Sequence, residues 1–405
     1  MKVCFVLPDR SPSGGAAVAS AHARGLTRDH GVDAELVTLD ALDEARGPYD
    51  VAIATWWETV PALWQLDAAR RALLFQSFEQ RFYDRDAPLE QVSAETTLAL
   101  PLDYIAVSHW LRDALLRLRP DARCHVVQPG IDKGVFTWTE QPARDGPLEV
   151  LIEGQPTLSF KGVQEAVAAV GAMGEPVRTT LVALDPDAAE GARVDRLVGG
   201  LDAASMAELY RQSDVMLKLS RVEGLGLAPL EGFHCGLPCV VTPFTGHQEY
   251  VRHGENGIVV GFDDVEGTAG WLDALARDRE LLGTLSDGAR RTAEGWPSPD
   301  ASTRLLHEAL VEIAEGPPPA VDEQLLMRTL ALGTSLGRAR LTRRQVATEH
   351  ALTRAEALVR ELSDSRDECA ERLEESTAEL ERIRSTRAYR LGAAVKRAAT
   401  PRGRG

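Results

Sequence analysis

Short, continuous apolar runs alternate with helix-like stretches along most of this chain. Runs of this kind, separated by helices rather than by tight turns, are typical of parallel strands that are buried on both faces of a sheet. We therefore predict an α/β fold with two doubly wound, Rossmann-like domains that face each other across a cleft. The predicted strands are 3–7, 34–39, 51–54, 72–75, 104–107 and 125–128, then 149–152, 178–182, 215–219, 239–241 and 257–260.

The length of 405 residues exceeds what one hydrophobic core supports and fits two domains of about 150 residues with an extension. After the two domains we expect an amphipathic helix, a proline-rich linker, a helical extension and a basic tail. The expected bounds are 1–137 and 147–296 for the domains, 297–315 for the helix, 316–321 for the linker, 322–383 for the extension and 384–405 for the tail.

The extension carries apolar or small residues at heptad spacing, which predicts a coiled coil and, through it, a homo-oligomer. A single solvated helix lying on the protein's own surface fits the pattern almost as well. The tail has seven basic residues and no acidic ones, which fits either contact with an anionic membrane surface or a disordered solubilising tail. The predicted seam is Leu352, Ala355, Val359, Leu362, Cys369, Leu373, Leu380 and Ile383, interrupted by Arg366 and Ser376.

Composition excludes several classes of protein. The formal net charge of −16 argues against bulk binding of nucleic acid, because a polyanion would be repelled. Five scattered cysteines fit a reducing cytoplasm rather than a disulfide framework, and Cys235 and Cys239 lack local partners for a zinc site. The N-terminal apolar run ends at Pro8, well short of a signal peptide or a membrane span. We expect a cytoplasmic protein whose tail can contact the inner face of the membrane.

The segment 220–241, SRVEGLGLAPLEGFHCGLPCVV, combines a glycine-broken loop with the start of a helix. Gly224 and Gly226 allow positive φ and leave backbone N–H groups uncovered, and Pro229 fits the first turn of a helix. A helix N-terminus carries partial positive charge and unpaired N–H groups, so it can bind a phosphate or a diphosphate. The segment therefore predicts an anion site.

Two carboxylates border this predicted site. Glu223 lies just before the loop, and we expect Glu231 within the first helical turn, so both could flank one pocket. Because carboxylates accept hydrogen bonds from hydroxyls, the pair suits a nucleotide sugar, which has diols on either side of its diphosphate. Alternatively, both are ordinary favourable charges near the N-terminus of a surface helix.

This segment resembles the E-x7-E signature of the family 4 retaining glycosyltransferases (glycosyl transferases group 1), which have the GT-B fold. Residues 151–162, LIEGQPTLSFKG, resemble the family's strand and phosphate-contacting loop, with Lys161 in the place of its diphosphate lysine. The likeness covers residues 1–315 and is closest in the second half. Further similar segments are 1–15, 126–136, 206–220 and 245–260.

The resemblance implies an enzyme that moves a sugar, with retention, from a nucleotide-diphosphate sugar to an acceptor hydroxyl. Such enzymes act in cell-surface polysaccharide or glycoconjugate assembly, on glycan or lipid-linked acceptors. The first domain would be the acceptor side, the second would bind the nucleotide sugar, and the helix 297–315 would return to the first domain. The nucleotide sugar is a co-substrate, and neither a cofactor nor a metal is implied.

By resemblance, Glu223 contacts the donor sugar, Glu231 holds the ribose diol, and Lys161 with the loop amides stabilises the leaving diphosphate. Glu223 and Lys161 are therefore the catalytic candidates. Two glycines that follow the first predicted strand join the donor-binding set because of their position at the cleft. The donor-binding candidates are Gly14, Gly15, Lys161, Glu223, Gly224, Leu225, Gly226, Leu227 and Glu231.

One position departs from the family's pattern. The family usually places an arginine six residues before the phosphate lysine, and here that position is Gln155. A neutral amide replaces a charged planar fork, so the diphosphate loses a charge-assisted partner. Arg221, beside Glu223, could substitute for that arginine or could form an exposed salt bridge instead.

The acceptor candidates lie at or after the ends of predicted strands in the first domain. Trp56 and Trp57 could stack on an acceptor sugar, although aromatic residues there often fill the core. Gln76 and Glu79 occupy the region where many relatives carry a histidine and an acidic residue. That histidine is absent, and His109 is either its replacement or a packing residue at a helix start.

Two other functions fit the sequence. A nucleotide-sugar epimerase of the same fold would release nucleotide without an acceptor. A noncatalytic assembly partner would recruit enzymes through the coiled coil and the tail, with Gln155 marking a decayed donor site. Asp185-Pro186-Asp187 has the letters of a metal-binding Asp-x-Asp site but lies among turn residues, so we expect metal-independent transfer.

Overall fold

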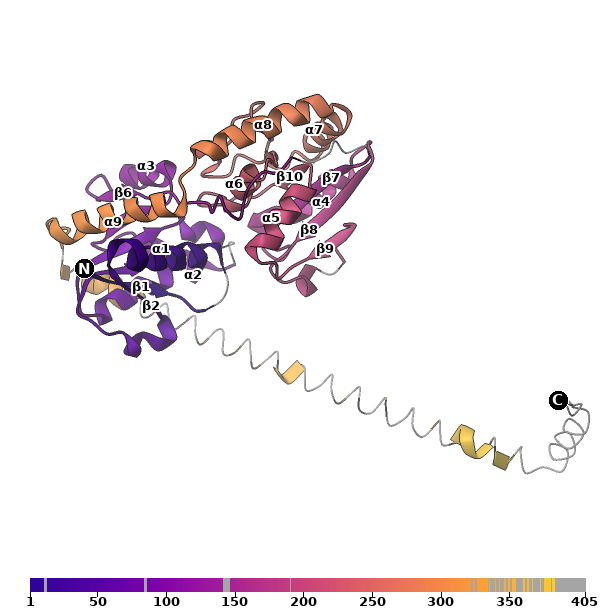
Figure 1. Ribbon diagram of the computed structural model, residues 1–405. Helices are drawn as coiled ribbons and strands as arrows, with labels where there is room; N and C mark the ends of the chain where they lie inside the picture. Colours follow the sequence, from indigo (N-terminus) through magenta and orange to yellow (C-terminus); the bar gives the residue numbers. More distant parts are fainter. Residues whose placement is uncertain are drawn as a thin grey trace, which may run out of the picture. The chain divides into compact units, whose positions relative to one another are not determined.

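The computed structural model describes residues 1–321, apart from 11–12, 84–85, 141–145 and 190, and scattered residues between 323 and 382. The chain divides into two units, Met1–Leu336 and Gly337–Gly405. Both predicted sheets lie in the first unit (Figure 1). The predicted heptad seam lies outside the described residues except at Leu352, Arg366 and Ser376, and the basic tail lies wholly outside them.

The first sheet is parallel throughout and has the strand order β2-β1-β3-β4-β5-β6. Its first strand in the sequence lies inside the sheet and is buried, because Val3 to Val6 are 0% exposed. The strands are β1 (Lys2–Leu7), β2 (Asp33–Thr38), β3 (Tyr49–Ala54), β4 (Ala68–Phe75), β5 (Asp103–Ala106) and β6 (Cys124–Val126), and the helices between them are α1 (Gly14–His30), α2 (Pro88–Thr97) and α3 (His109–Leu118).

The second sheet is also parallel and has the order β12-β11-β10-β7-β8-β9. Its strands are β7 (Leu148–Glu153), β8 (Val177–Val182), β9 (Arg196–Val198), β10 (Val215–Lys218), β11 (Cys239–Val241) and β12 (Gly257–Val259). The helices are α4 (Val163–Gly171), α5 (Ala203–Gln212), α6 (Leu227–His234), α7 (Val265–Arg277), α8 (Arg279–Gly295) and α9 (Pro299–Glu315).

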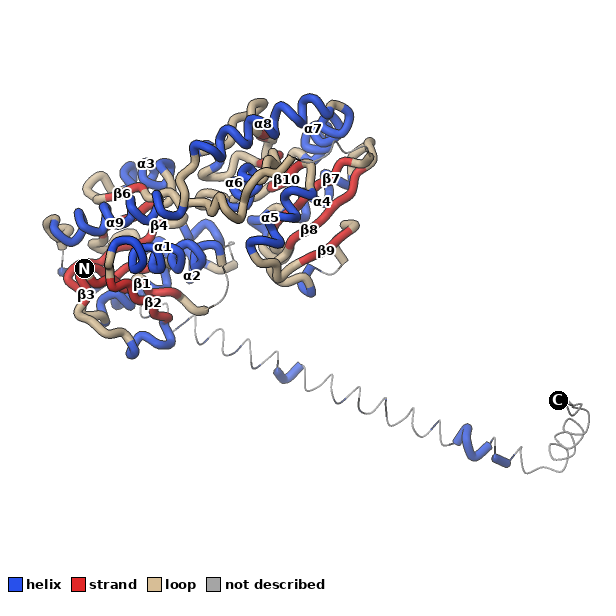
Figure 2. The backbone as a smooth tube through the Cα atoms, in the orientation of Figure 1, coloured by secondary structure: helices blue, strands red, loops and turns tan. Residues whose placement is uncertain are grey.

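Seven short 3-10 helices occupy loops of the described chain. They are η1 (Leu39–Glu44), η2 (Trp57–Thr59), η3 (Pro61–Gln65), η4 (Glu79–Phe82), η5 (Ser159–Lys161), η6 (Asp187–Ala189) and η7 (His247–Glu249). The parallel strands, with helices packed around them, confirm the predicted fold class (Figure 2). The short strand β9 was not predicted, because only two of its three residues, Leu197 and Val198, are apolar.

Two crossings of the chain between the sheets lie side by side and are bonded to each other. The Ile131 amide donates to the carbonyl of Pro297 at 3.1 Å, and the indole N–H of Trp296 donates to the carbonyl of Pro129 at 2.9 Å. A Cβ on Gly130 would lie 2.3 Å from the Ser298 backbone, so only glycine permits this approach. The crossings therefore form one paired connection.

After the second crossing, α9 packs against α1 and against β3, β4 and β5 of the first sheet (Figure 1). Close packing of the two helices depends on Gly25, where a Cβ would lie 2.6 Å from Thr303 Oγ1. None of the helices in the described part of the chain is long and apolar enough to cross a membrane.

A buried arginine fastens the end of α9 to the first sheet. Arg70 of β4 is 6% exposed, and its guanidinium pairs at 2.7 Å with Asp103 of β5, which is 0% exposed. The same guanidinium donates to the carbonyl of Pro317 at 3.0 Å and to that of Gly316. Arg123 pairs with the other carboxylate oxygen of Asp103. The residues that follow α9 are thus held by charge as well as by packing.

We expect Arg70→Met to lower the free energy of unfolding by about 3 kcal/mol, the lower end for breaking a buried ion pair, because Arg123 still pairs with Asp103. The matched control is Arg28→Met, since Arg28 joins α1 to α9 through an exposed ion pair with Asp300. Guanidinium denaturation of the two variants measures the difference. Equal destabilisation by both substitutions would contradict the role of Arg70 in holding the residues after α9 against the first sheet.

Candidate functional site

A cavity of about 1030 Å³ is lined by residues that follow strands of both sheets. The carboxyl ends of parallel strands are where open α/β sheets bind ligands. The first sheet contributes the loops after β1, β3 and β4, and the second contributes those after β7, β8 and β10. All nine predicted donor-binding residues line this one cavity: Gly14, Gly15, Lys161, Glu223, Gly224, Leu225, Gly226, Leu227 and Glu231.

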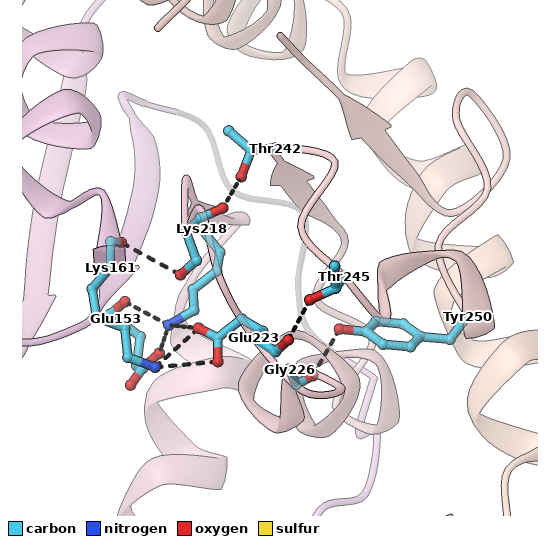
Figure 3. Close-up of polar contacts among 9 residues, drawn as sticks. Glu153, Lys161, Lys218, Glu223, Gly226, Thr242, Thr245 and Tyr250 are labelled. Carbon is cyan, nitrogen blue, oxygen red and sulfur yellow. Dashed lines mark hydrogen bonds and ion pairs between the residues drawn. The ribbon is translucent and has the colours of Figure 1, made fainter. Parts of the chain in front are cut away.

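A cluster of two ammonium groups and two carboxylates lies on the second-sheet side of the cavity (Figure 3). Lys161 Nζ lies 2.9 and 3.2 Å from the two oxygens of Glu223. Lys218, the last residue of β10, lies 3.3 Å from the same carboxylate. Lys218 also pairs with the carboxylate of Glu153 and donates to the Glu153 carbonyl at 3.1 Å. Because β7 and β10 are neighbours, the sheet itself brings Glu153 and Lys218 together.

These contacts determine the charge of the cluster. Burial raises the pKa of Glu223, but Lys218 and then Lys161 outweigh burial and lower that pKa to about 2. Burial disfavours the charged form of Lys218, yet Glu153 and Glu223 raise its pKa above the ordinary value. Both groups are therefore ionised at neutral pH. A buried charge of this kind persists only when it is paired.

Glu231 has a different environment. It is the fifth residue of α6, so the prediction that it lies within the first turn is wrong: the helix begins at Leu227, close behind the loop. Its carboxylate accepts a hydrogen bond from Tyr210 at 3.0 Å. Burial raises the pKa of Glu231 to about 7, against the Tyr210 hydrogen bond and with help from the charge of Glu153. Glu231 thus changes charge near neutral pH.

The alternative that both glutamates are charges on a surface helix does not fit these positions. Glu223 precedes α6, and its side chain is only 12% exposed. Glu231 lines the cavity and bonds to Tyr210 of α5. The two carboxylates border the same cavity in different electrostatic settings, one held ionised and the other near its titration point.

The loop between Glu223 and α6 turns its carbonyls to the rest of the second domain. Tyr250 OH donates to the Gly226 carbonyl at 2.7 Å, and Thr245 donates to the Glu223 carbonyl (Figure 3). Gly226 is the residue before the helix and has φ of 83°, as predicted for a glycine here. The first N–H groups of the helix that follows have no intrahelical acceptor. The loop therefore leaves donors at the cavity wall.

A glycine is needed at position 224 for a reason other than the predicted positive φ. Gly224 does not have a positive φ. Instead, a Cβ on Gly224 would lie 1.7 Å from the backbone oxygen of Gln76, at the end of β4 in the other sheet. Glycine is thus required by the close approach of the two loops. This contact closes the cavity between the sheets.

The structure brings two of the five acceptor candidates to the cavity. Trp56 and Gln76 line it, and the Gln76 amide donates to the Thr55 carbonyl at 3.0 Å beside Gly15. The other three do not line the cavity. Trp57 is buried at 6% exposure, Glu79 is buried and accepts from the Trp57 amide at 2.6 Å, and His109 is exposed at the start of α3. Burial raises the pKa of Glu79 well above its usual range, against the hydrogen bond from the Trp57 amide.

Neither Gln155 nor Arg221 supplies charge to the cavity. The Gln155 amide exchanges two hydrogen bonds with the Asp185 backbone, at 2.9 and 3.2 Å. Arg221 pairs with Asp263 and with Glu165, which is the salt-bridge alternative for this residue. The described residues contain no group of three or more acidic, histidine or cysteine side chains arranged to hold a metal, at Asp185 and Asp187 or elsewhere.

The residues of the cavity wall that were not predicted include the three that bond to Glu223, Glu231 or each other: Glu153, Tyr210 and Lys218. A signal existed for Lys218, because VMLKL places a full charge inside an apolar strand, and lysine is almost never buried unless it is paired. Glu153 and Tyr210 carry no comparable signal, since a glutamate at the end of a strand and a tyrosine on an amphipathic helix are common.

We expect Gly224→Ala to push the loop before α6 away from Gln76 and to lower the free energy of unfolding by about 1 to 3 kcal/mol, as overpacking does. Gly14→Ala is the control on the same cavity, because its Cβ would lie 3.7 Å from Leu227, which is ordinary contact. Hydrogen exchange of peptides around 76 and 224 should accelerate only in Gly224→Ala. Unchanged exchange in that variant would contradict the contact.

Part of the second domain matches a known family model. The family model described as "Glycosyl transferases group 1" matches residues 189–292, within the second sheet and its helices. D-inositol 3-phosphate glycosyltransferase 1 of Catenulispora acidiphila is 26% identical over 270 residues, which cover 58% of this chain and 64% of that protein. The chain spans between 23% and 64% of the length of the curated relatives that it matches.

Solved structures share the fold of the first unit. Sucrose-phosphate synthase from Thermosynechococcus elongatus superposes with a TM-score of 0.67 at 16% identity, over 77% of this chain and 98% of that one. Anabaena Alr3699/HepE, in complex with UDP and glucose, superposes with a TM-score of 0.61 at 16% identity, over 77% and 100%. The chain has the GT-B fold, and residues 189–292 are similar to the glycosyl transferases group 1.

Proposed function

We propose that this protein is a retaining glycosyltransferase that moves a sugar from a nucleoside diphosphate sugar to an acceptor hydroxyl. The observation that carries the proposal is the convergence of Lys161, Glu223, Glu231 and the loop before α6 on one cavity between the two sheets. The Anabaena neighbour holds UDP and glucose, which supports a nucleotide sugar as the class of ligand.

The diphosphate would lie between Lys161 and the N-terminus of α6. Lys161 is suited to this role because its side chain is 23% exposed and lines the cavity, and its ammonium group pairs with the carboxylate of Glu223. Negative charge grows on the diphosphate as the bond to the sugar breaks. An ammonium group and backbone N–H groups already in place stabilise that charge without reorganisation.

The two glutamates would hold the two sugars. Glu223 is ionised and can only accept hydrogen bonds, so it would orient the transferred sugar through its hydroxyls. Glu231 would accept hydrogen bonds from the ribose diol. The acceptor would enter from the first sheet, past Trp56 and Gln76, and its proton would pass to the departing phosphate oxygen. This route requires neither a metal ion nor a protein nucleophile.

The proposal extends to a biological setting: assembly of a cell-surface polysaccharide or glycoconjugate, in the cytoplasm or at the inner face of the membrane. The acceptor would be a glycan or a lipid-linked sugar. Of these points, the cavity supports only the need for a second substrate, because its volume of about 1030 Å³ is at the upper end for a single small ligand.

The test is transfer by the full chain with a panel of nucleoside diphosphate sugars and glycan or lipid-linked acceptors, with products identified by mass spectrometry, with and without EDTA. We expect transfer with retention that survives EDTA. Lys161→Ala should reduce the rate about a hundred- to thousandfold, as loss of one oxyanion-stabilising donor does. Lys133→Ala is the control, because Lys133 is exposed and outside the cavity.

The same assay separates the rival functions. Epimerised donor, formed without any acceptor, would indicate an epimerase. Absence of nucleoside diphosphate binding in calorimetry, together with identical behaviour of Lys161→Ala, would indicate a noncatalytic assembly partner. Loss of transfer in EDTA would exclude the metal-independent route.

The raised pKa of Glu231 predicts how nucleotide binding depends on pH. Below about pH 7 the carboxyl is neutral, and above it the ionised form accepts stronger hydrogen bonds from the ribose diol. Affinity for UDP should therefore rise about tenfold as pH increases through 7, since hydrogen bonds to a charged group are worth about 1.5 to 3 kcal/mol. Glu231→Gln should remove this dependence, as measured by calorimetry. The same pH profile in both proteins would refute the role of Glu231.

A further inference from the structure

Lys218 is a lysine in a place where lysines rarely occur. Its side chain is 2% exposed, and it ends a strand whose other residues are all apolar and buried. Its ammonium group contacts the carboxylates of Glu153 and Glu223 and the carbonyl of Glu153. These three acceptors match the three protons of an ammonium group. Lys218 is thus fixed, whereas Lys161 is more exposed and reaches Glu223 from outside.

The two lysines share one carboxylate, and this sharing has a consequence for the proposed function, on which the present inference rests. If Lys161 turns to a diphosphate, Glu223 loses one of its two cations while it remains at the bottom of the cavity. A buried carboxylate without a cation is expected to take up a proton. A protonated Glu223 would no longer orient sugar hydroxyls purely as an acceptor.

We propose that Lys218 is a positioning residue that serves as the permanent counter-ion of Glu223, so that Lys161 is released to the diphosphate without protonation of Glu223. Glu153 holds Lys218 from the opposite side and prevents the ammonium group from following the ligand. In this arrangement Lys161 binds the ligand, and Lys218 stays paired with Glu223. The pairing of Lys218 with Glu223 and Glu153 also explains why a charged residue ends the otherwise apolar strand β10.

Every group that faces Glu223 fits this assignment. Lys218 of β10 and Lys161 of η5 lower its pKa, and the hydroxyl of Ser220 adds a hydrogen bond that lowers it further. Glu153 of β7 acts on Glu223 through Lys218, and Tyr250 is a further titratable neighbour, whose pKa is raised by burial and, to a lesser extent, by the charge of Glu223. Burial acts in the opposite direction on Glu223. Of its two cations, Lys218 is the deeper, with a side chain 2% exposed against 23% for Lys161, and it lowers the pKa of Glu223 more than Lys161 does.

The test measures the charge of Glu223 directly and does not depend on activity. Carboxyl carbons of glutamate are labelled with 13C, the Glu223 signal is assigned with Glu223→Gln, and pH titrations follow it by NMR. Lys161→Ala imitates the departure of Lys161 to a ligand. In this variant we expect Glu223 to remain ionised at pH 5. Adding Lys218→Met should raise the pKa of Glu223 by about 1 to 3, as loss of a close opposite charge does.

Glu153→Gln is the matched control, because it removes a partner of Lys218 but leaves the contact between Lys218 and Glu223. In a Lys161→Ala background it should leave Glu223 ionised at pH 5 and should lower the pKa of Glu231, which Glu153 helps to raise. If the Met variant does not fold, Lys218→Gln removes the same charge while retaining an amide donor, and the same rise is expected.

Identical titration of Glu223 with and without Lys218 would overturn the inference. A second readout links it to turnover: in Lys218→Met, the acid limb of the kcat profile, which reports the substrate-bound enzyme, should move to higher pH by about 1 to 3 pH units, with UDP affinity unchanged. An unmoved acid limb would also count against it. Failure of the whole chain to bind UDP would instead defeat the proposed function, while the NMR titration would still decide the role of Lys218.

Discussion

The electrostatic pairing at Glu223 is the constraint on which the rest of the site depends. Two ammonium groups, those of Lys161 and Lys218, lie within 3.3 Å of one largely buried carboxylate. Neither cation could occupy this wall of the cavity without carboxylates beside it, because an unpaired charge there would be strongly disfavoured. The sheet supplies the geometry, since β7 and β10 are adjacent and end at the same edge. The paired charges, which would be disfavoured in an apolar core, thus lie at the cavity wall, where a charged ligand can contact them.

A second requirement is that the two sheets meet closely enough to share a cavity. Gly224 touches the backbone at Gln76, and Glu249 of η7 accepts hydrogen bonds from the Trp110 amide at 2.9 Å and from the Gln128 side chain at 3.0 Å. The Trp110 amide belongs to the N-terminus of α3, where a carboxylate is favoured by the helix dipole. These contacts join the sheets beside the paired crossings. The cavity is therefore a property of the closed arrangement, and glycine at 224 is part of it.

Much of this could be read from the sequence. Continuous apolar strands separated by helices predicted both parallel sheets, and the segment 220–241 predicted a glycine loop leading into a helix beside two glutamates. What escaped prediction depends on contacts between distant residues. The approach of Gly224 to Gln76 and the partners of Arg221 are not encoded in local spacing. Glu79 resembles a site residue by position, yet it is a buried carboxyl that accepts a hydrogen bond from the Trp57 amide and has a raised pKa because of its burial. Lys218 is a single charge in an apolar strand, and its partner Glu153 lies 65 residues away in the sequence, so local spacing does not predict their pairing.

The central claim is that one cavity holds a diphosphate at Lys161 and α6, with a sugar at Glu223 and a ribose at Glu231. A crystal structure of the full chain grown with UDP tests this claim most directly. The account predicts the diphosphate within hydrogen-bonding distance of Lys161 and of the first amides of α6, the ribose diol on Glu231, and Lys218 still on Glu223. UDP bound outside this cavity, or bound within it without contact to Lys161 and Glu231, would contradict the account.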